Sequence, residues 1–167
     1  LSTEVCTYYY QHDSTYPAGL RKQVASAIAA IEKAMGTRFG DRRNPLLLSV
    51  RSGARVSMPG MMDTVLNLGL NDETVLGLAK ATDNERFAYD AYRRLINMFG
   101  DVVMGMEHSI FEQAFEKVRY KHKAEQDTDV PTEGMIELCD AYKSIYRENT
   151  GKHFPQDPLR QLELAIE

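Results

Sequence analysis

Hydrophobic residues recur at helical spacing along most of the chain. After Pro17, one face of a predicted helix collects five apolar side chains, namely Leu20, Val24, Ile28, Ile31 and Met35. From about residue 71 onward, further apolar runs with a period of three to four residues continue to the end of the chain. This spacing is typical of amphipathic helices that bury one face. It predicts a helical subdomain over residues 71–152 and a last helix within residues 153–167 that returns toward the preceding part.

Residues with capping preferences mark the ends of several of these helices. Thr82 and Glu85 have the spacing of a capping box, in which a hydroxyl side chain starts a helix and a carboxylate three residues later closes the first turn. Gly151 stands where a helix would end, because glycine readily adopts the left-handed conformation found there. Asp157 followed by Pro158 is the pattern of an N-cap with proline at the first helical position. These signals divide the second half of the chain into separate helices.

Two short apolar runs interrupt the helical pattern in the first half of the chain. Leu46–Val50 is a continuous apolar run with one serine, and turn residues bound it, so it predicts a strand buried on both faces. Val65–Leu68 predicts a second strand. The expected fold is therefore α/β and predominantly helical, with an α/β part over residues 1–70. Composition agrees with a globular domain, since 43% of the 167 residues are hydrophobic and 26% are charged.

Charge and cysteine content narrow the classes of function. The formal net charge is -4, and a mildly acidic chain is a poor candidate for binding nucleic acid, which requires a basic surface. No apolar run is long enough to cross a bilayer, which needs about 18 residues, so we expect no membrane partner. Cys6 and Cys139 have no CxxC partner, which favours a reduced, cytoplasmic setting, with an organelle left open because no true N-terminus is visible. The chain begins without an initiator Met, and we interpret it as a piece of a longer polypeptide.

The loop between the two predicted strands carries the candidate chemistry. Between Asp41 and Thr64 there are four arginines, of which Arg42 and Arg43 precede the first strand and Arg51 and Arg55 follow it. Arg51 follows the first strand directly, and guanidinium groups offer a rigid fork of donors that matches phosphate oxygens. Gly53 and Gly60 allow the backbone to approach a ligand, and Thr64 adds a hydroxyl donor. These residues point to a polyphosphate-binding loop, although paired arginines also form ordinary surface salt bridges. The loop's methionines suit a purine face or a protein core.

Three stretches of the sequence resemble one family. "NPLLLSVRSGARVSMPGMMDTVLNLGLND" is similar to the signature of the nucleotide-binding domain of the pyruvate phosphate dikinases. "FAYDAYRRLINMFGDVVMG" and "GKHFPQDPLRQLELAI" resemble the same family and follow in the same order. The resemblance covers essentially the whole chain. The related phosphoenolpyruvate synthases have a looser version of the loop, so "SMPGMMDTVLNLG" favours the dikinase branch.

This resemblance implies that the chain is part of the first lobe of an ATP-grasp domain with a helical-bundle subdomain. The family converts ATP, phosphate and pyruvate to AMP, pyrophosphate and phosphoenolpyruvate through a phosphohistidine carried on another domain. The nucleotide-binding residues that it implies are Arg51, Arg55, Gly60, Met62 and Thr64. No catalytic residue and no metal ligand is expected within this chain. Mg²⁺ is expected to be bound mainly by residues outside it.

The resemblance also implies what lies elsewhere in the parent protein. A lysine-bearing glycine-rich loop, the carboxylates for Mg²⁺, the phosphohistidine domain and the pyruvate site are all expected outside these residues. The remaining domains of the parent are therefore partners, the parent is expected to be a homodimer, and the fragment alone is not expected to turn over. Two alternatives stay open at this point. One is a phosphoenolpyruvate synthase-like dikinase, and the other is a helical interaction or scaffold segment without a ligand site.

Overall fold

The computed structural model describes residues 1–52 and 63–167. The chain divides into two compact units, Leu1–Thr37 and Arg38–Glu167, and each is described by itself. Most of the described residues are helical, with two small two-stranded sheets. This agrees with the expected α/β, predominantly helical class. Among the helices described, none is both long and apolar enough to span a membrane.

The first unit consists of two helices, α1 (Thr3–Gln11) and α2 (Leu20–Met35). Helix α2 begins three residues after Pro17, because Gly19 adopts a left-handed backbone and starts the helix there. It ends at Gly36, whose N–H donates to the Glu32 carbonyl. The predicted helix after Pro17 is therefore confirmed, with its start moved along the chain.

The second unit contains both sheets. Strands β1 (Arg38–Phe39) and β2 (Pro45–Leu46) form a parallel pair, and β3 (Leu48–Arg51) and β4 (Thr64–Leu68) form an antiparallel pair. The expected single strand over residues 46–50, buried on both faces, is wrong. It is split between β2 and β3, and along β3 the side chains alternate between half-buried and exposed. An antiparallel pair can leave one face in water, which explains the exposed Ser49 and Arg51.

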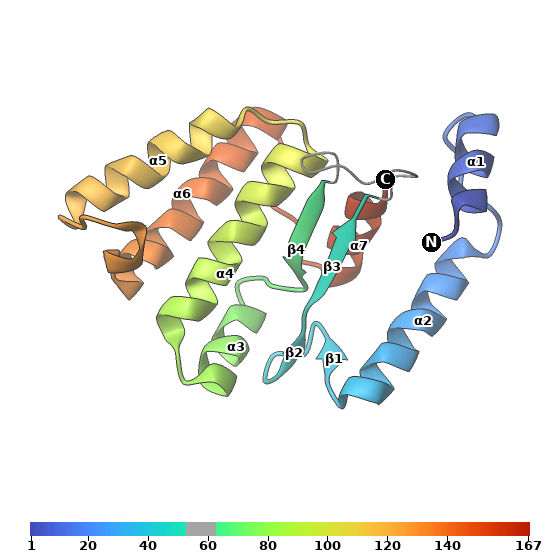
Figure 1. Ribbon diagram of the computed structural model, residues 1–167, viewed down its shortest axis with the longest axis horizontal. Helices are drawn as coiled ribbons and strands as arrows, with labels where there is room; N and C mark the ends of the chain where they lie inside the picture. The colour runs from blue at the N-terminus through green and yellow to red at the C-terminus, as the bar shows by residue number, and fades with distance from the viewer. Residues whose placement is uncertain (53–62) are drawn as a thin grey trace. The chain divides into compact units, whose positions relative to one another are not determined.

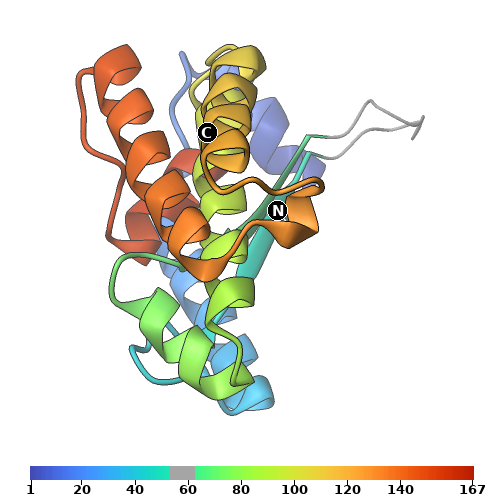
Figure 2. The same ribbon diagram turned by 90° about the vertical axis from the view of Figure 1, so that its left-hand side faces the viewer.

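Helices follow the strands along the chain of this unit. They are α3 (Thr74–Thr82), α4 (Glu85–Met98), α5 (His108–Lys121), α6 (Thr132–Thr150) and α7 (Pro158–Ile166), with a π-helical turn η1 (Phe99–Val103) after α4 and a 3-10 turn η2 (Asp127–Asp129) before α6. Helix α4 packs against β4, α3 and α6, and α5 packs on α6. Helix α7 contacts both strands of the β3–β4 pair, so that helices lie on two sides of it (Figures 1 and 2).

Aromatic rings build much of the core of this unit. The Phe154 ring makes edge contacts with the rings of Tyr92, Phe99 and Tyr146, with centroid distances of 6.1, 5.5 and 5.6 Å. Phe154 lies between α6 and α7, so it brings the return segment onto the core formed by α4 and α6. Leu95 in α4 is fully buried in this core.

The helix ends agree with the sequence at two positions and differ at one. Gly151 adopts a left-handed conformation at the end of α6 and donates its N–H to Arg147. The carboxylate of Asp157 accepts the N–H of Leu159 at 3.1 Å and so caps α7. The expected cap at Thr82 is wrong, because Thr82 ends α3 instead. The cap of α4 is Asn84, whose Oδ1 accepts the N–H of Phe87 at 2.9 Å.

Candidate functional site

Arg51 and Thr64 lie side by side at one end of the β3–β4 pair. They are directly opposed residues of the antiparallel ladder, and such residues project from the same face with their Cβ atoms about 5 Å apart. The next residues hold the two strands together. The Ser52 N–H donates to the Asp63 carbonyl at 2.9 Å, and the Asp63 N–H donates to the Ser52 Oγ at 2.8 Å. A guanidinium and a hydroxyl are thus presented together on a fixed backbone.

The structure separates the arginines that the sequence groups together. Arg42 lies in the β1–β2 connection, at the opposite end of the β3–β4 pair from Arg51 (Figure 1), and forms an ion pair with Glu73 at 2.8 Å. Arg43 lies beside it, in a turn closed by Asp41, whose carboxylate accepts the N–H groups of Arg43 and Asn44. These two hydrogen bonds lower the pKa of the Asp41 carboxyl.

Arg51 differs from Arg42 in its surroundings. Its side chain is exposed, and within residues 1–52 and 63–167 no carboxylate is paired with it. The guanidinium is therefore open to an anionic ligand from solvent. Three of the residues that the resemblance assigns to the nucleotide, Arg55, Gly60 and Met62, fall outside the described residues. Of the expected set, the structure brings together Arg51 and Thr64.

A buried amide that the sequence analysis did not select holds the other end of β4. Gln161 of α7 is fully buried, and its Oε1 accepts the Gly69 N–H at 2.9 Å. Its Nε2 donates to the carbonyls of Leu70 and Pro155, each at 2.8 Å. Gly69 also needs its left-handed backbone, with φ of 107°, and a Cβ there would meet the Phe39 ring at 2.9 Å. A glutamine among the apolar positions of the last helix was the available signal.

A second cluster of hydrogen-bonded polar side chains is centred on Asp72. The Asp72 carboxylate accepts hydrogen bonds from the Tyr92 hydroxyl at 3.0 Å and from Lys143 Nζ at 2.7 Å. The Gln156 side chain joins them, since its Oε1 accepts the Asp72 N–H and its Nε2 donates to the Tyr92 hydroxyl. Burial raises the pKa of Tyr92 strongly. Burial alone would lower the pKa of Lys143, but hydrogen bonds to Asp72 and Asp140 outweigh it and raise that pKa. This cluster connects α4, α6 and the segment before α7.

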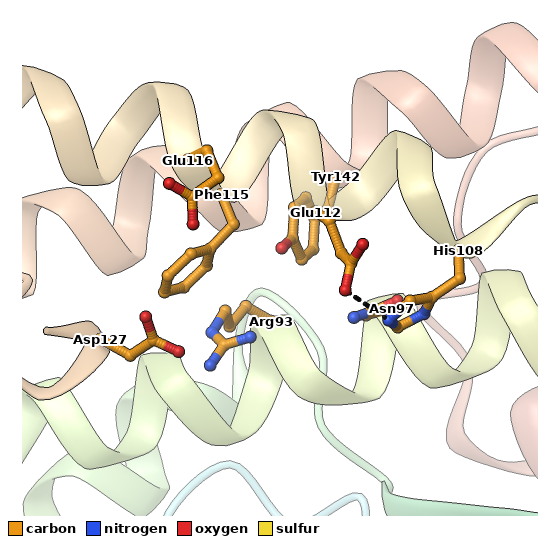
Figure 3. A pocket seen from close by; sticks show the side chains of 8 residues that line it. All are labelled: Arg93, Asn97, His108, Glu112, Phe115, Glu116, Asp127 and Tyr142. Carbon is orange, nitrogen blue, oxygen red and sulfur yellow. Dashed lines mark ion pairs between the residues drawn. The ribbon is translucent and has the colours of Figure 1, made fainter.

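The helical part also contains a cavity of about 420 Å³. Figure 3 shows the side chains that line it, which are Arg93, Asn97, His108, Glu112, Phe115, Glu116, Asp127 and Tyr142. Its charges are largely engaged with protein groups. Arg93 pairs with Asp90 at 2.8 Å and lies over the Phe115 ring, 4.7 Å from its centroid, and His108 faces Glu112 at 3.4 Å. Neither Arg51 nor Thr64 lines this cavity.

No metal centre emerges from the part of the chain that the structure describes. Within it, no group of three or more His, Cys, Asp or Glu side chains is arranged to hold an ion. Both cysteines are free thiols; Cys6 is exposed, and Cys139 is buried in α6. Burial raises the pKa of the Cys139 thiol to about 12. Cys139 therefore behaves as a small apolar residue with a weak donor.

Comparison with known proteins gives a consistent result over the whole chain. A family profile described as "Pyruvate phosphate dikinase, AMP/ATP-binding domain" matches residues 13–151. A pyruvate, phosphate dikinase of Giardia intestinalis is 54% identical over 157 residues, which is 94% of this chain and 18% of that protein. A chloroplastic one of Mesembryanthemum crystallinum is 52% identical over 100% of this chain, and pyruvate, phosphate dikinase 2 of Zea mays is 50% identical over 99%. The chain spans less than a fifth of the length of these relatives.

Proposed function

Because the chain belongs to the pyruvate phosphate dikinase family, within its AMP/ATP-binding domain, we propose that the Arg51–Thr64 end of its β3–β4 pair contacts the phosphates of ATP. The observation that carries this proposal is the exposed guanidinium of Arg51. It stands beside a hydroxyl and, among the described residues, without a carboxylate partner. Phosphate oxygens accept charge-assisted hydrogen bonds from such a group, often two at once.

The role of Arg51 in this proposal is to neutralise and orient a phosphate group. Phosphoryl transfer depends mostly on positioning and on stabilising charge that builds up on the phosphate oxygens. A guanidinium held at a strand end supplies both, because the ladder fixes its backbone before ligand arrives. We place Arg55, Gly60 and Met62 in the same site on the strength of the family resemblance.

The wider assignment follows from the family. We propose that residues 1–70 form part of the first lobe of an ATP-grasp domain, with residues 71–152 as its helical subdomain and residues 153–167 as a helix returning to the α/β part. The parent would convert ATP, phosphate and pyruvate to AMP, pyrophosphate and phosphoenolpyruvate through a phosphohistidine on another domain. The relatives are named pyruvate, phosphate dikinases, which favours this reaction over that of a phosphoenolpyruvate synthase or a scaffold.

The metal and the partner domains belong, in this proposal, to the parts of the parent protein outside this chain. Mg²⁺ would shield the phosphate charges, and we propose that residues outside this chain hold it. The parent's remaining domains are the partners of this segment, and we propose a homodimer in the cytoplasm or, as some relatives' names indicate, in a chloroplast.

The test is Arg51→Ala in the full-length parent enzyme, with its two half-reactions measured separately. The activation free energy of phosphoryl transfer from ATP to the enzyme should rise by about 2–4 kcal/mol, which is the usual cost of losing one preorganised donor to a charged group. Exchange between phosphoenolpyruvate and pyruvate should keep its rate, because it takes place on other domains. Rapid quench with labelled ATP and labelled pyruvate measures the two reactions.

Arg42→Ala is the matched control. It removes an exposed arginine from the other end of the same strands, where Glu73 already neutralises the charge. We expect both half-reactions to stay within about twofold of the parent enzyme, because exposed ion pairs contribute little. If Arg42→Ala slowed the ATP reaction as much as Arg51→Ala, the phosphate contact could not be assigned to Arg51.

A further inference from the structure

Between two successive paired positions, strand β4 contains one residue more than strand β3. Here β3 advances from Leu48 to Val50, whereas β4 covers the distance from Leu68 to Val65. Two residues of one strand therefore oppose one residue of the other, which is a β-bulge. Asn67 lies within this bulge and has a left-handed backbone with φ of 61°.

The bulge decides which residues of β4 face the core. Side chains alternate between the two faces of a regular strand. Val65 and Leu68 are nevertheless both buried although they are three residues apart, and Leu66 between them is 38% exposed. If the extra residue were absorbed into a regular ladder, Val65 would turn outward and Thr64 would turn toward the core. The bulge therefore keeps Thr64 beside Arg51 on the face away from the core.

Asn67 holds the bulge in two ways. Its short polar side chain is among the few that tolerate a left-handed backbone, whereas a β-branched residue there is strongly disfavoured. Its Nδ2 also donates to the Ala91 carbonyl of α4 at 3.0 Å. The bond ties the irregular point of the strand to a helix that packs directly on β4. Bulges of this kind commonly occur next to active sites, where they redirect a side chain.

We propose that Asn67 is a positioning residue of the nucleotide site. It touches no phosphate itself. By holding the bulge it sets the face from which Thr64 projects, and with it the geometry of the Arg51–Thr64 pair. This inference rests on the function proposed above, because it assumes that this pair contacts ATP.

The experiment uses three variants of Asn67 in the full-length parent enzyme. Asn67→Val places a β-branched side chain at a positive φ and removes the amide, so it should abolish the bulge. Asn67→Gly accepts the backbone but lacks the bond to Ala91, and Asn67→Asp keeps the size but has no N–H donor. For each variant, kcat/KM for ATP is measured in the ATP half-reaction, and the phosphoenolpyruvate–pyruvate exchange is measured alongside.

We expect Asn67→Val to lower kcat/KM for ATP at least tenfold and to leave the exchange reaction within twofold. Asn67→Gly and Asn67→Asp should fall between the parent and Asn67→Val, since each retains part of what holds the bulge. Asn149→Asp is the matched control. Asn149 is exposed on α6 and its Nδ2 also donates to a helix carbonyl, that of Ile145 at 2.9 Å. This control should behave as the parent in both reactions.

Three results would overturn the inference. The first is Asn67→Val within threefold of the parent for ATP. The second is a loss of kcat/KM for ATP in Asn67→Gly as large as that in Asn67→Val. Because glycine tolerates the backbone of the bulge, such a loss would not be caused by the bulge. The third is an equal loss in both half-reactions across the series, which would assign Asn67 to folding of the whole protein. Arg51→Ala in the same assay separates the two proposals, because a normal ATP reaction in that variant refutes the phosphate site itself.

Discussion

Replacing Gln161 tests how strongly α7 is joined to β4. Gln161→Met keeps an unbranched side chain of similar volume but removes every hydrogen bond of the amide. Three backbone groups then lose their partner, namely the Gly69 N–H and the carbonyls of Leu70 and Pro155. The Gln161 side chain is 0% exposed and its bonds to Gly69 and Leu70 are buried, so water does not reach those two groups without opening the structure, whereas the bond to the Pro155 carbonyl is part-buried.

The magnitude follows from the number and kind of groups left unpaired. A buried donor or acceptor without a partner costs about 1–3 kcal/mol, and carbonyls tolerate it better than N–H groups do. The three groups together should therefore destabilise the folded chain by about 3–6 kcal/mol. A domain of this size is typically stable by about 5–15 kcal/mol, so the change would remove a large fraction of the total.

Urea unfolding followed by circular dichroism measures this loss. The matched control is Gln113→Met, because Gln113 is an exposed glutamine of α5 and its replacement should change the unfolding free energy by less than about 0.5 kcal/mol. If Gln161→Met lost less than about 1 kcal/mol relative to this control, the amide would not be the connection that its hydrogen bonds indicate. The reasoning about buried backbone groups at the end of β4 would then be refuted.

Two further predictions concern the helical part. Leu95→Ala should lower the free energy of unfolding, measured by heat or urea, by about 2–5 kcal/mol. Leu159 is 54% exposed, so Leu159→Ala should lower it by less than about 1 kcal/mol. Similar losses in both variants would contradict the assigned core. At pH 8 a thiol reagent should label Cys6 alone, because Cys139 is buried and its pKa of about 12 keeps it a thiol; rapid labelling of both without denaturant would contradict this packing.

Helices were predictable here because their signals are local. The period of the apolar residues depends on sequence neighbours, and so do end signals such as Gly151 and Asp157. The strand pattern was less informative. A period of two places Leu66 and Leu68 on one face of β4, yet the core receives Val65 and Leu68. The cause is the bulge at Asn67, whose side chain is bonded to a helix 24 residues further along the chain. No window of the sequence around β4 contains that partner.

The candidate site shows the same division between local and distant causes. Arg51 could be selected from the sequence, because an arginine after a strand and before glycines suits a phosphate. The sequence could not show how each arginine is paired, because Arg42 has the same chemistry as Arg51 and is also exposed. What separates them is Glu73, placed beside Arg42 by the packing of α3 against β2. Charge density along the chain overestimates how many guanidinium groups are available to a ligand.

The stretch that carries the family resemblance contains residues with two different tasks. Arg51 and Thr64 are the residues that we propose contact the ligand, whereas Asn67 and Gly69 are hydrogen-bonded to helices α4 and α7. Strand β4 is thus fixed to one helix at its bulge and to another just past its end. Its start, at Thr64, extends beyond both attachments. The contacts of β4 with these helices therefore set the position of the proposed phosphate contact. Substitutions in those contacts should lower the rate of the ATP half-reaction even though the substituted residues do not contact ATP.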